Sequence, residues 1–297
     1  TCPTPREMAE DRRVWRKRAT AIADAALQAS GLEDPGERML SAPAKSIRGV
    51  KGKVGVIPIH GPVDQRYSSE LGKAGGTPLD YVSAALDNLI ANQAIGAIVL
   101  HMDSPGGCSY GVQEIADKIH NARAEKPIYA MVDSMAASAG YWIATAATMV
   151  ICTPGGDVGS VGVYCMHVDE SKAMEQDGFR VTFVAAGEYK VELSPFSPLS
   201  DDAKANLQES VNATYGKFVG ALARNRSTSA DDVRTNYGQG RCLNADQALK
   251  AGMCDRILTF EQLLAKLTGP AASSQGQAKA MMRMMQQQRE RMRARAS

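Results

Sequence analysis

A serine among small residues and two possible bases are the residues of this chain best suited to nucleophilic catalysis. Ser138 lies in Met135-Ala-Ala-Ser-Ala-Gly-Tyr-Trp142, where small neighbours leave room for a substrate backbone. A nucleophilic serine needs a base, and His167 and Lys190 both follow it in the sequence. A lysine serves as a base once desolvation brings its pKa down from about 10.4 toward neutrality. Taken singly, Ser138 could equally be a helix-packing serine and Lys190 a solvated loop lysine.

A glycine-rich turn, Asp103-Ser-Pro-Gly-Gly107, follows an apolar segment. Backbone N–H groups in such a turn can face an anion, so the turn could be a phosphate cradle, an oxyanion hole or a plain tight turn. The G-K-[ST] ending of a P-loop is absent, and G-x-G-x-x-G does not occur there. The residues alone leave the other two interpretations open.

The elements that must position these residues alternate regularly from Val54 onward. Apolar segments predict strands at 54–59, 95–102, 128–132, 149–152, 161–165 and 180–185. Amphipathic spacing predicts helices at 79–92, 112–119 and 169–177, and a long helix capped by Ser200. Turns are expected at 103–107 and 133–138. This alternation predicts an α/β fold with a mainly parallel sheet, in which ligands bind beyond the carboxyl ends of the strands.

Charge and composition divide the chain into three parts. Residues 1–53 predict a helical arm, with a helix at 5–30, and a linker; residues 54–268 form the main domain; residues 269–297 form a tail. The tail contains six basic residues and one acid, or +5, against +2 for the whole chain. We expect it to be solvated and partly helical, with docking on a partner or on nucleic acid as the alternative. The near-neutral whole argues against nucleic acid as the main partner.

The remaining composition excludes several kinds of site. Six cysteines form no C-x-x-C pair and only four histidines are present, so we expect free thiols in a reducing compartment and no metal site. No apolar stretch approaches the ~20 residues that span a bilayer, and the N-terminus has no apolar core of a secretory signal. We therefore expect a cytoplasmic protein without a membrane span.

Several motifs in collinear order resemble the signal peptide peptidase A family. They are Asp103–Gly107, Met135–Trp142, Gly159-Ser-Val-Gly-Val163, Tyr189-Lys190, Ser194-Pro-Phe-Ser-Pro-Leu-Ser200 and the segment Gly240–Asp255. The resemblance covers residues 54–267. It implies a Clp-protease-like, crotonase-type spiral of ββα units and peptide hydrolysis by a Ser/Lys dyad without a cofactor.

Matched position by position, the resemblance assigns roles to five residues. Ser138 is expected to be the nucleophile and Lys190 the general base, 52 residues later. Ser160 is expected to hold the lysine amine in line. The N–H of Gly107 is expected to donate to the oxyanion, with the amide of Ala139 as a second donor.

Within the family, the chain resembles the head-maturation proteases of tailed phages more than the envelope enzymes. The loop Gly187-Glu-Tyr-Lys-Val-Glu-Leu-Ser-Pro-Phe-Ser197 and the polar tail carry this resemblance. It implies scaffold or capsid proteins as substrates, and a ring of identical subunits. A bacterial protease that acts on residual signal peptides is the alternative within the family.

Two other functional classes are possible for a chain with these motifs. An acyl-CoA enzyme of the same fold would use the oxyanion amides but would leave both Ser138 and Lys190 unexplained. A non-enzymatic assembly protein would suit the basic tail and the N-terminal helix, but not the Ser/Lys/Ser set.

Overall fold

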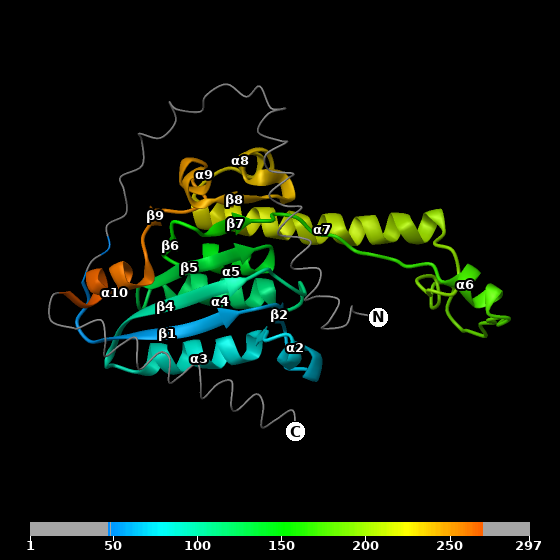
Figure 1. Cartoon of the computed structure of the whole chain (residues 1–297), viewed down its shortest axis with the longest axis horizontal. Helices are drawn as coiled ribbons and strands as arrows, with labels where there is room; N and C mark the ends of the chain where they lie inside the picture. The colour runs from blue at the N-terminus through cyan, green and yellow to red at the C-terminus, as the bar shows by residue number, and fades with distance from the viewer. Residues whose placement is uncertain (1–46, 48, 270–297) are drawn as a thin grey trace.

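A mainly parallel sheet with helices on both faces forms the centre of the computed structural model of this chain (Figure 1). The structure describes residue 47 and residues 49–269. The predicted helix at 5–30 and the tail from residue 270 lie outside the described residues. The predicted α/β class is confirmed.

The central sheet has the order β1-β4-β5-β6-β9, and its neighbouring strands on this path are parallel. Strand β5 pairs with β6 through its first half and with β7 through its second half, and β7 pairs antiparallel with β8. The strands of the sheet are β1 (Lys53–His60), β4 (Ile95–Ser104), β5 (Ile128–Ala137), β6 (Met149–Cys152), β7 (Asp157–Gly159), β8 (Cys242–Asn244) and β9 (Arg256–Ile257). A small parallel pair, β2 (Val63–Asp64) and β3 (Thr77–Pro78), stands apart.

The helices largely follow the predicted periodicity. Ser200 accepts a hydrogen bond from the N–H of Ala203, as its predicted capping role requires. The helices are α2 (Ser69–Lys73), α3 (Leu79–Ala91), α4 (Val112–Ala122), α5 (Ala139–Thr145), α6 (Ser171–Gln176), α7 (Asp201–Arg226), α8 (Ala230–Asn236), α9 (Ala245–Lys250) and α10 (Phe260–Thr268), with a 3₁₀ turn η1 (Gly238–Gly240).

Strand β4 shows why this sheet is buried on both faces. Ile98, Leu100 and Met102 belong to the core cluster that includes residues of α3, α4, α5 and α7. Ala97 and Val99, on the opposite face, pack in a second cluster with α10. A strand covered on both faces needs a continuous apolar sequence, which is what β4 has.

The structure differs from the prediction between β7 and α7. The segments predicted as strands at 161–165 and 180–185 are not strands, and those predictions were wrong. The end of the first segment and all of the second belong to a long excursion, residues 164–199, which we call the arm, whereas Val161 packs in the core. Figure 1 shows the arm running out from the sheet to α6 and returning to the start of α7. A β-strand needs a neighbour to pair with, and the arm leaves the sheet that could provide one.

Candidate active site

Ser138 occupies a sharp junction between a strand and a helix. Strand β5 ends at Ala137, helix α5 begins at Ala139, and Ser138 has φ 52° and ψ −124°. A positive φ is unfavourable for residues other than glycine, so surrounding contacts must hold the Ser138 backbone in this conformation. The N–H of Ser138 donates to the carbonyl of Gly159 at 2.8 Å, and the carbonyl of Ser138 accepts from the N–H of Trp142 at 3.0 Å. The half-buried serine is therefore fixed from both sides.

Ser160 lies beside this junction because β5 and β7 run in parallel register. Ala137 of β5 pairs with Gly159 of β7, and the residue that follows each strand is a serine: Ser138 after β5 and Ser160 after β7. Ser160 also has a positive φ, 53°, and its N–H donates to the carbonyl of Arg241 at 2.9 Å. Sheet register thus brings together two serines that are 22 residues apart in sequence.

Gly107 presents its amide to the same region. It forms an isolated parallel bridge with Val63, in which Val63 N–H donates to Gly106 O at 2.9 Å and Cys108 N–H donates to Val63 O at 3.0 Å. These bonds use the groups on either side of Gly107, so its own N–H points away from Val63. No hydrogen bond found within residues 49–269 is donated by that N–H. A Cβ on Gly107 would overlap the Val63 carbonyl, which explains why glycine is required.

The Asp103–Gly107 turn and the junction at Ser138 touch directly. Gly106 has φ 100°, and a Cβ added there would lie 2.7 Å from the Cβ of Ser138 and 2.9 Å from the carbonyl oxygen of Ala137. The amide of Ala139 is at the first position of α5, where a helix offers no intrahelical acceptor. The geometry is therefore compatible with both expected oxyanion donors.

A pocket of about 710 Å³ opens over these residues. Its lining carries hydroxyl, amide and apolar groups, but no carboxylate, imidazole or ammonium group. The lining residues are Pro105, Gly107, Ser138, Ser160, Val161, Gly162, Val163, Tyr164, Gln208, Val211, Asn212, Tyr215, Gln239 and Gly240. The pocket is thus lined by two serine hydroxyls and the Gly107 backbone, but by no side chain among the described residues that could act as a general base.

Both candidate bases lie on the arm and are absent from the pocket lining. Lys190 is exposed in a turn, where its N–H donates to Gly187 O at 3.2 Å. His167 Nε2 is 3.1 Å from the carbonyl oxygen of Ser194, so this imidazole is engaged within the arm. Glu192, close to Lys190 in sequence, accepts a hydrogen bond from Asn206 near the start of α7. The segment with Lys190 therefore packs beside the outer end of α7, away from the sheet (Figure 1).

The arm also carries most of the exposed apolar surface. Of the twelve large hydrophobic side chains that are exposed among the described residues, ten belong to the arm. Val184 is 99% exposed and Tyr164 is 88% exposed. The others are Met166, Val168, Phe179, Val181, Phe183, Tyr189, Leu193 and Phe196. A contiguous segment with so many exposed apolar side chains is typical of an interaction surface.

Sequence reasoning missed the wall of the pocket that α7 provides. Gln208, Val211, Asn212 and Tyr215 follow one another at helical spacing and line the pocket together. The periodicity was readable in the sequence, but nothing there indicated which face of α7 would meet β5 and β7.

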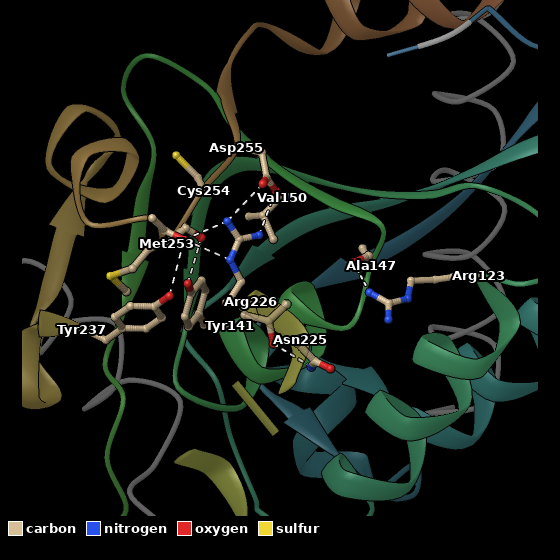
Figure 2. A network of polar contacts seen from close by, with 12 residues as sticks. Arg123, Tyr141, Ala147, Val150, Asn225, Arg226, Tyr237, Met253, Cys254 and Asp255 are labelled. Atoms are coloured by element: carbon tan, nitrogen blue, oxygen red, sulfur yellow. Dashed lines mark hydrogen bonds and ion pairs between the residues drawn. The ribbon is translucent and has the colours of Figure 1, made fainter. Parts of the chain in front are cut away.

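A buried ion pair anchors the other end of α7 (Figure 2). Arg226 forms two hydrogen bonds to the Asp255 carboxylate, at 2.8 and 3.1 Å, and its Nη2 donates to Gly252 O at 2.7 Å. Burial opposes the charge, but Asp255 raises the pKa of Arg226 above its ordinary value. Tyr141 of α5 donates its hydroxyl to Met253 O at 2.8 Å. This network ties the serine-bearing helix and α7 to the loop before β9.

Membrane-spanning helices, metal-binding groups and disulfides are all absent among the described residues. Among residues 49–269, no helix combines the length and apolar character that a bilayer crossing requires. The same region holds no group of three or more His, Cys, Asp or Glu side chains placed to bind a metal ion. Cys108, Cys152, Cys165, Cys242 and Cys254 are free thiols.

Comparisons with known proteins converge on one family. The model of peptidase family S49 matches residues 120–273. Capsid assembly protease C of Escherichia phage lambda is 30% identical over 79% of this chain and 52% of its own length. Head-tail preconnector protein GP5 of Enterobacteria phage P21 is 27% identical over 73% of this chain and 42% of its own length. The chain thus spans about half the length of these curated relatives.

The fold can also be compared with solved structures. A ClpP1 mutant from Listeria monocytogenes aligns with 70% of this chain and 94% of its own, with a TM-score of 0.44 and 17% identity. The family match comes from the sequence, independently of this weaker structural similarity.

Proposed function

Because the chain belongs to peptidase family S49, we propose that it is a serine endopeptidase that cleaves proteins during capsid assembly. One observation carries the proposal. Ser138, Ser160 and the free amide of Gly107 surround a single pocket where β5 and β7 end. The resemblance to a capsid assembly protease supports scaffold or capsid polypeptides as substrates, inside a prohead in the host cytoplasm. In this proposal residues 54–268 are the peptidase domain.

The chemistry begins at Ser138. A neutral lysine amine removes the proton from its hydroxyl, and the oxygen attacks the carbonyl carbon of the scissile peptide bond. The N–H groups of Gly107 and Ala139 donate to the oxyanion as it forms. The protonated lysine then gives its proton to the leaving amine. Water hydrolyses the resulting acyl-enzyme and restores Ser138.

We propose that Lys190 is this base and that it enters the pocket from the arm of a second copy. The support is threefold: the pocket lining lacks a base, Lys190 is exposed on the arm, and the arm carries a large apolar surface that no other residue of 49–269 covers. Burying that surface against another copy would also desolvate the lysine, which favours its neutral, basic form. Ser160, whose backbone is fixed by β5, β7 and Arg241, would hold the incoming amine in line.

The walls of the pocket suit an extended, uncharged stretch of polypeptide. Val161–Tyr164 forms one border, Pro105 and Gly107 form another, and α7 closes the pocket with amides, Val211 and Tyr215. Because no charged side chain lines the pocket, we expect neutral residues around the cleaved bond.

The test uses the full chain and labelled casein as an unfolded substrate. Wild type should cleave casein and react with a fluorophosphonate at Ser138, whereas Ser138→Ala should do neither. Ser134→Ala is the matched control, because Ser134 is a nearby serine with positive φ outside the pocket. Cleavage by Ser138→Ala at the wild-type rate would refute the proposal. Mass spectrometry of capsid proteins co-expressed with wild type or Ser138→Ala then identifies the natural substrate.

A further inference from the structure

Ser104 belongs to the Asp103–Gly107 motif, yet the mechanism above gives it no role. It is the last residue of β4, and its side chain is completely buried. It pairs with Ala136 of β5 after a register shift that follows Met102. It therefore lies between the strand that leads to Ser138 and the turn that presents Gly107.

The Ser104 hydroxyl uses both of its hydrogen-bonding capacities inside the protein. It donates to the carbonyl of Gly61 at 2.6 Å and accepts from the N–H of Gly106 at 3.2 Å. Gly61 begins the turn that leads to Val63, and Val63 bridges Gly107. One hydroxyl thus joins both segments that define where the Gly107 amide points.

The other side of Ser104 packs against the serine helix. A Cβ on Gly140, in the first turn of α5, would lie 3.1 Å from Ser104 Cβ and 3.2 Å from its Oγ. Because Gly106 packs against Ser138, little free space remains between the Asp103–Gly107 turn and the strand–helix junction at Ser138. Oxyanion donors act over a narrow range, about 2.7–3.1 Å from the developing charge. Ser104 is packed at this junction, so it can set the distance between the Gly107 amide and the Ser138 hydroxyl, on which the proposed reaction depends.

We propose that Ser104 is a positioning residue that sets the spacing between the Gly107 amide and the Ser138 hydroxyl. The inference rests on the proposed peptidase function. Removing the hydroxyl leaves Gly61 O and Gly106 N–H without their buried partner, so the turn relaxes away from its present geometry. The displaced amide stabilises the oxyanion less, while the pocket walls that bind the substrate stay in place.

The experiment compares Ser104→Ala with Thr145→Val, which also removes a buried, hydrogen-bonded hydroxyl, but at the far end of α5. The readouts are kcat and KM on a peptide taken from a casein cleavage site, and inhibition by the matching peptide aldehyde. Ser138 adds to the aldehyde carbon, and the oxygen formed occupies the oxyanion site. Ser104→Ala should lose about tenfold to a hundredfold in kcat and in aldehyde affinity, below the 10²–10³ lost with a whole donor, with KM little changed.

The possible outcomes separate the two proposals. A wild type that neither cleaves casein nor reacts with fluorophosphonate refutes the peptidase function itself. An active wild type with Ser104→Ala no weaker than Thr145→Val in kcat and aldehyde affinity refutes the role of Ser104. If Ser104→Ala does not fold, Ser104→Cys tests the same point, because a thiol is a weak donor and acceptor. Its kcat and aldehyde affinity should fall together, and wild-type values for both would overturn the inference.

Discussion

The amide of Ser138 donates a hydrogen bond to the carbonyl of Gly159 at 2.8 Å. This bond closes the pairing of β5 with β7 and holds Ser138 at a positive φ, with Ser160 directly after the paired strand β7. Local strain at both serines is thus maintained by sheet pairing on either side. The candidate site is a consequence of strand register, not of a flexible loop.

Gly107→Ala tests the oxyanion assignment. The new Cβ would overlap the Val63 carbonyl, so the bridge must open and the amide must move. We expect casein cleavage to fall by about 10²–10³, as for loss of one oxyanion donor. Gly155→Ala, where a Cβ meets no neighbour within 4 Å, is the control and should stay active. Wild-type activity in Gly107→Ala would remove this amide from the mechanism.

The arm should be the contact between copies. Val184→Asp places a charge in the most exposed apolar position of the arm, so it should weaken association and lower casein cleavage without loss of helix content. Light scattering after size-exclusion chromatography measures the mass of the particle. Lys172→Asp, on the exposed α6 of the same arm, is the control for an added acid. An unchanged mass and activity in Val184→Asp, Phe183→Asp and Tyr189→Asp would exclude the arm as the contact.

Arg226→Met should be strongly destabilising, because it leaves the largely buried Asp255 carboxylate without its main counter-charge. We expect a loss of about 3–5 kcal/mol in the free energy of unfolding by urea. Adding Asp255→Asn removes this largely buried charge while keeping an acceptor for Val150 N–H, so the double variant should be more stable than Arg226→Met alone. Simple additivity of the two single losses would contradict this account.

His120 should make the fold sensitive to mild acid. Burial lowers the pKa of His120 below 6.5, and the nearby Arg123 guanidinium lowers it further. The folded state therefore prefers the neutral ring, so this stabilisation is complete above the unfolded pKa of about 6.5 and is lost as the pH falls below it. His120→Gln should show a smaller drop in Tm between about pH 7 and pH 5.5. The same drop as in wild type would show that another group is responsible.

Much of the domain could be predicted from sequence because its strands are buried on both faces. The continuous apolar segment at 95–102 became β4, and the periodic segment at 79–92 became α3. The predicted turn at 133–138 was displaced, because β5 continues to Ala137 once β7 offers a partner. The apolar segments at 161–165 and 180–185 looked like strands for the same reason as β4, but no strand among the described residues pairs with them. Val161 packs in the core, whereas Tyr164 and the side chains at 181, 183 and 184 are not covered by the rest of residues 49–269.

The residues of the candidate site also divide into those that the sequence indicated and those that it did not. Strand register brings Ser138 and Ser160 to one pocket, and the bridge to Val63 holds Gly107 there. Sequence motifs had singled out all three residues. Ser104 and the α7 wall were not recognised, because their roles depend on three-dimensional contacts that spacing does not encode. Lys190 lies on the arm and outside the pocket lining, so its proposed role as the base requires a second copy, which the sequence of one chain does not indicate.

In the proposed mechanism, the nucleophile and the base of one site come from different copies. Ser138→Ala and Lys190→Ala should each be inactive, while Lys172→Ala should be active. Co-expressed in equal amounts, the two inactive chains should recover about a quarter of wild-type casein cleavage, since that share of sites pairs an intact serine with an intact lysine. Mixed oligomers that form, as seen by native mass spectrometry, but remain inactive would contradict the account.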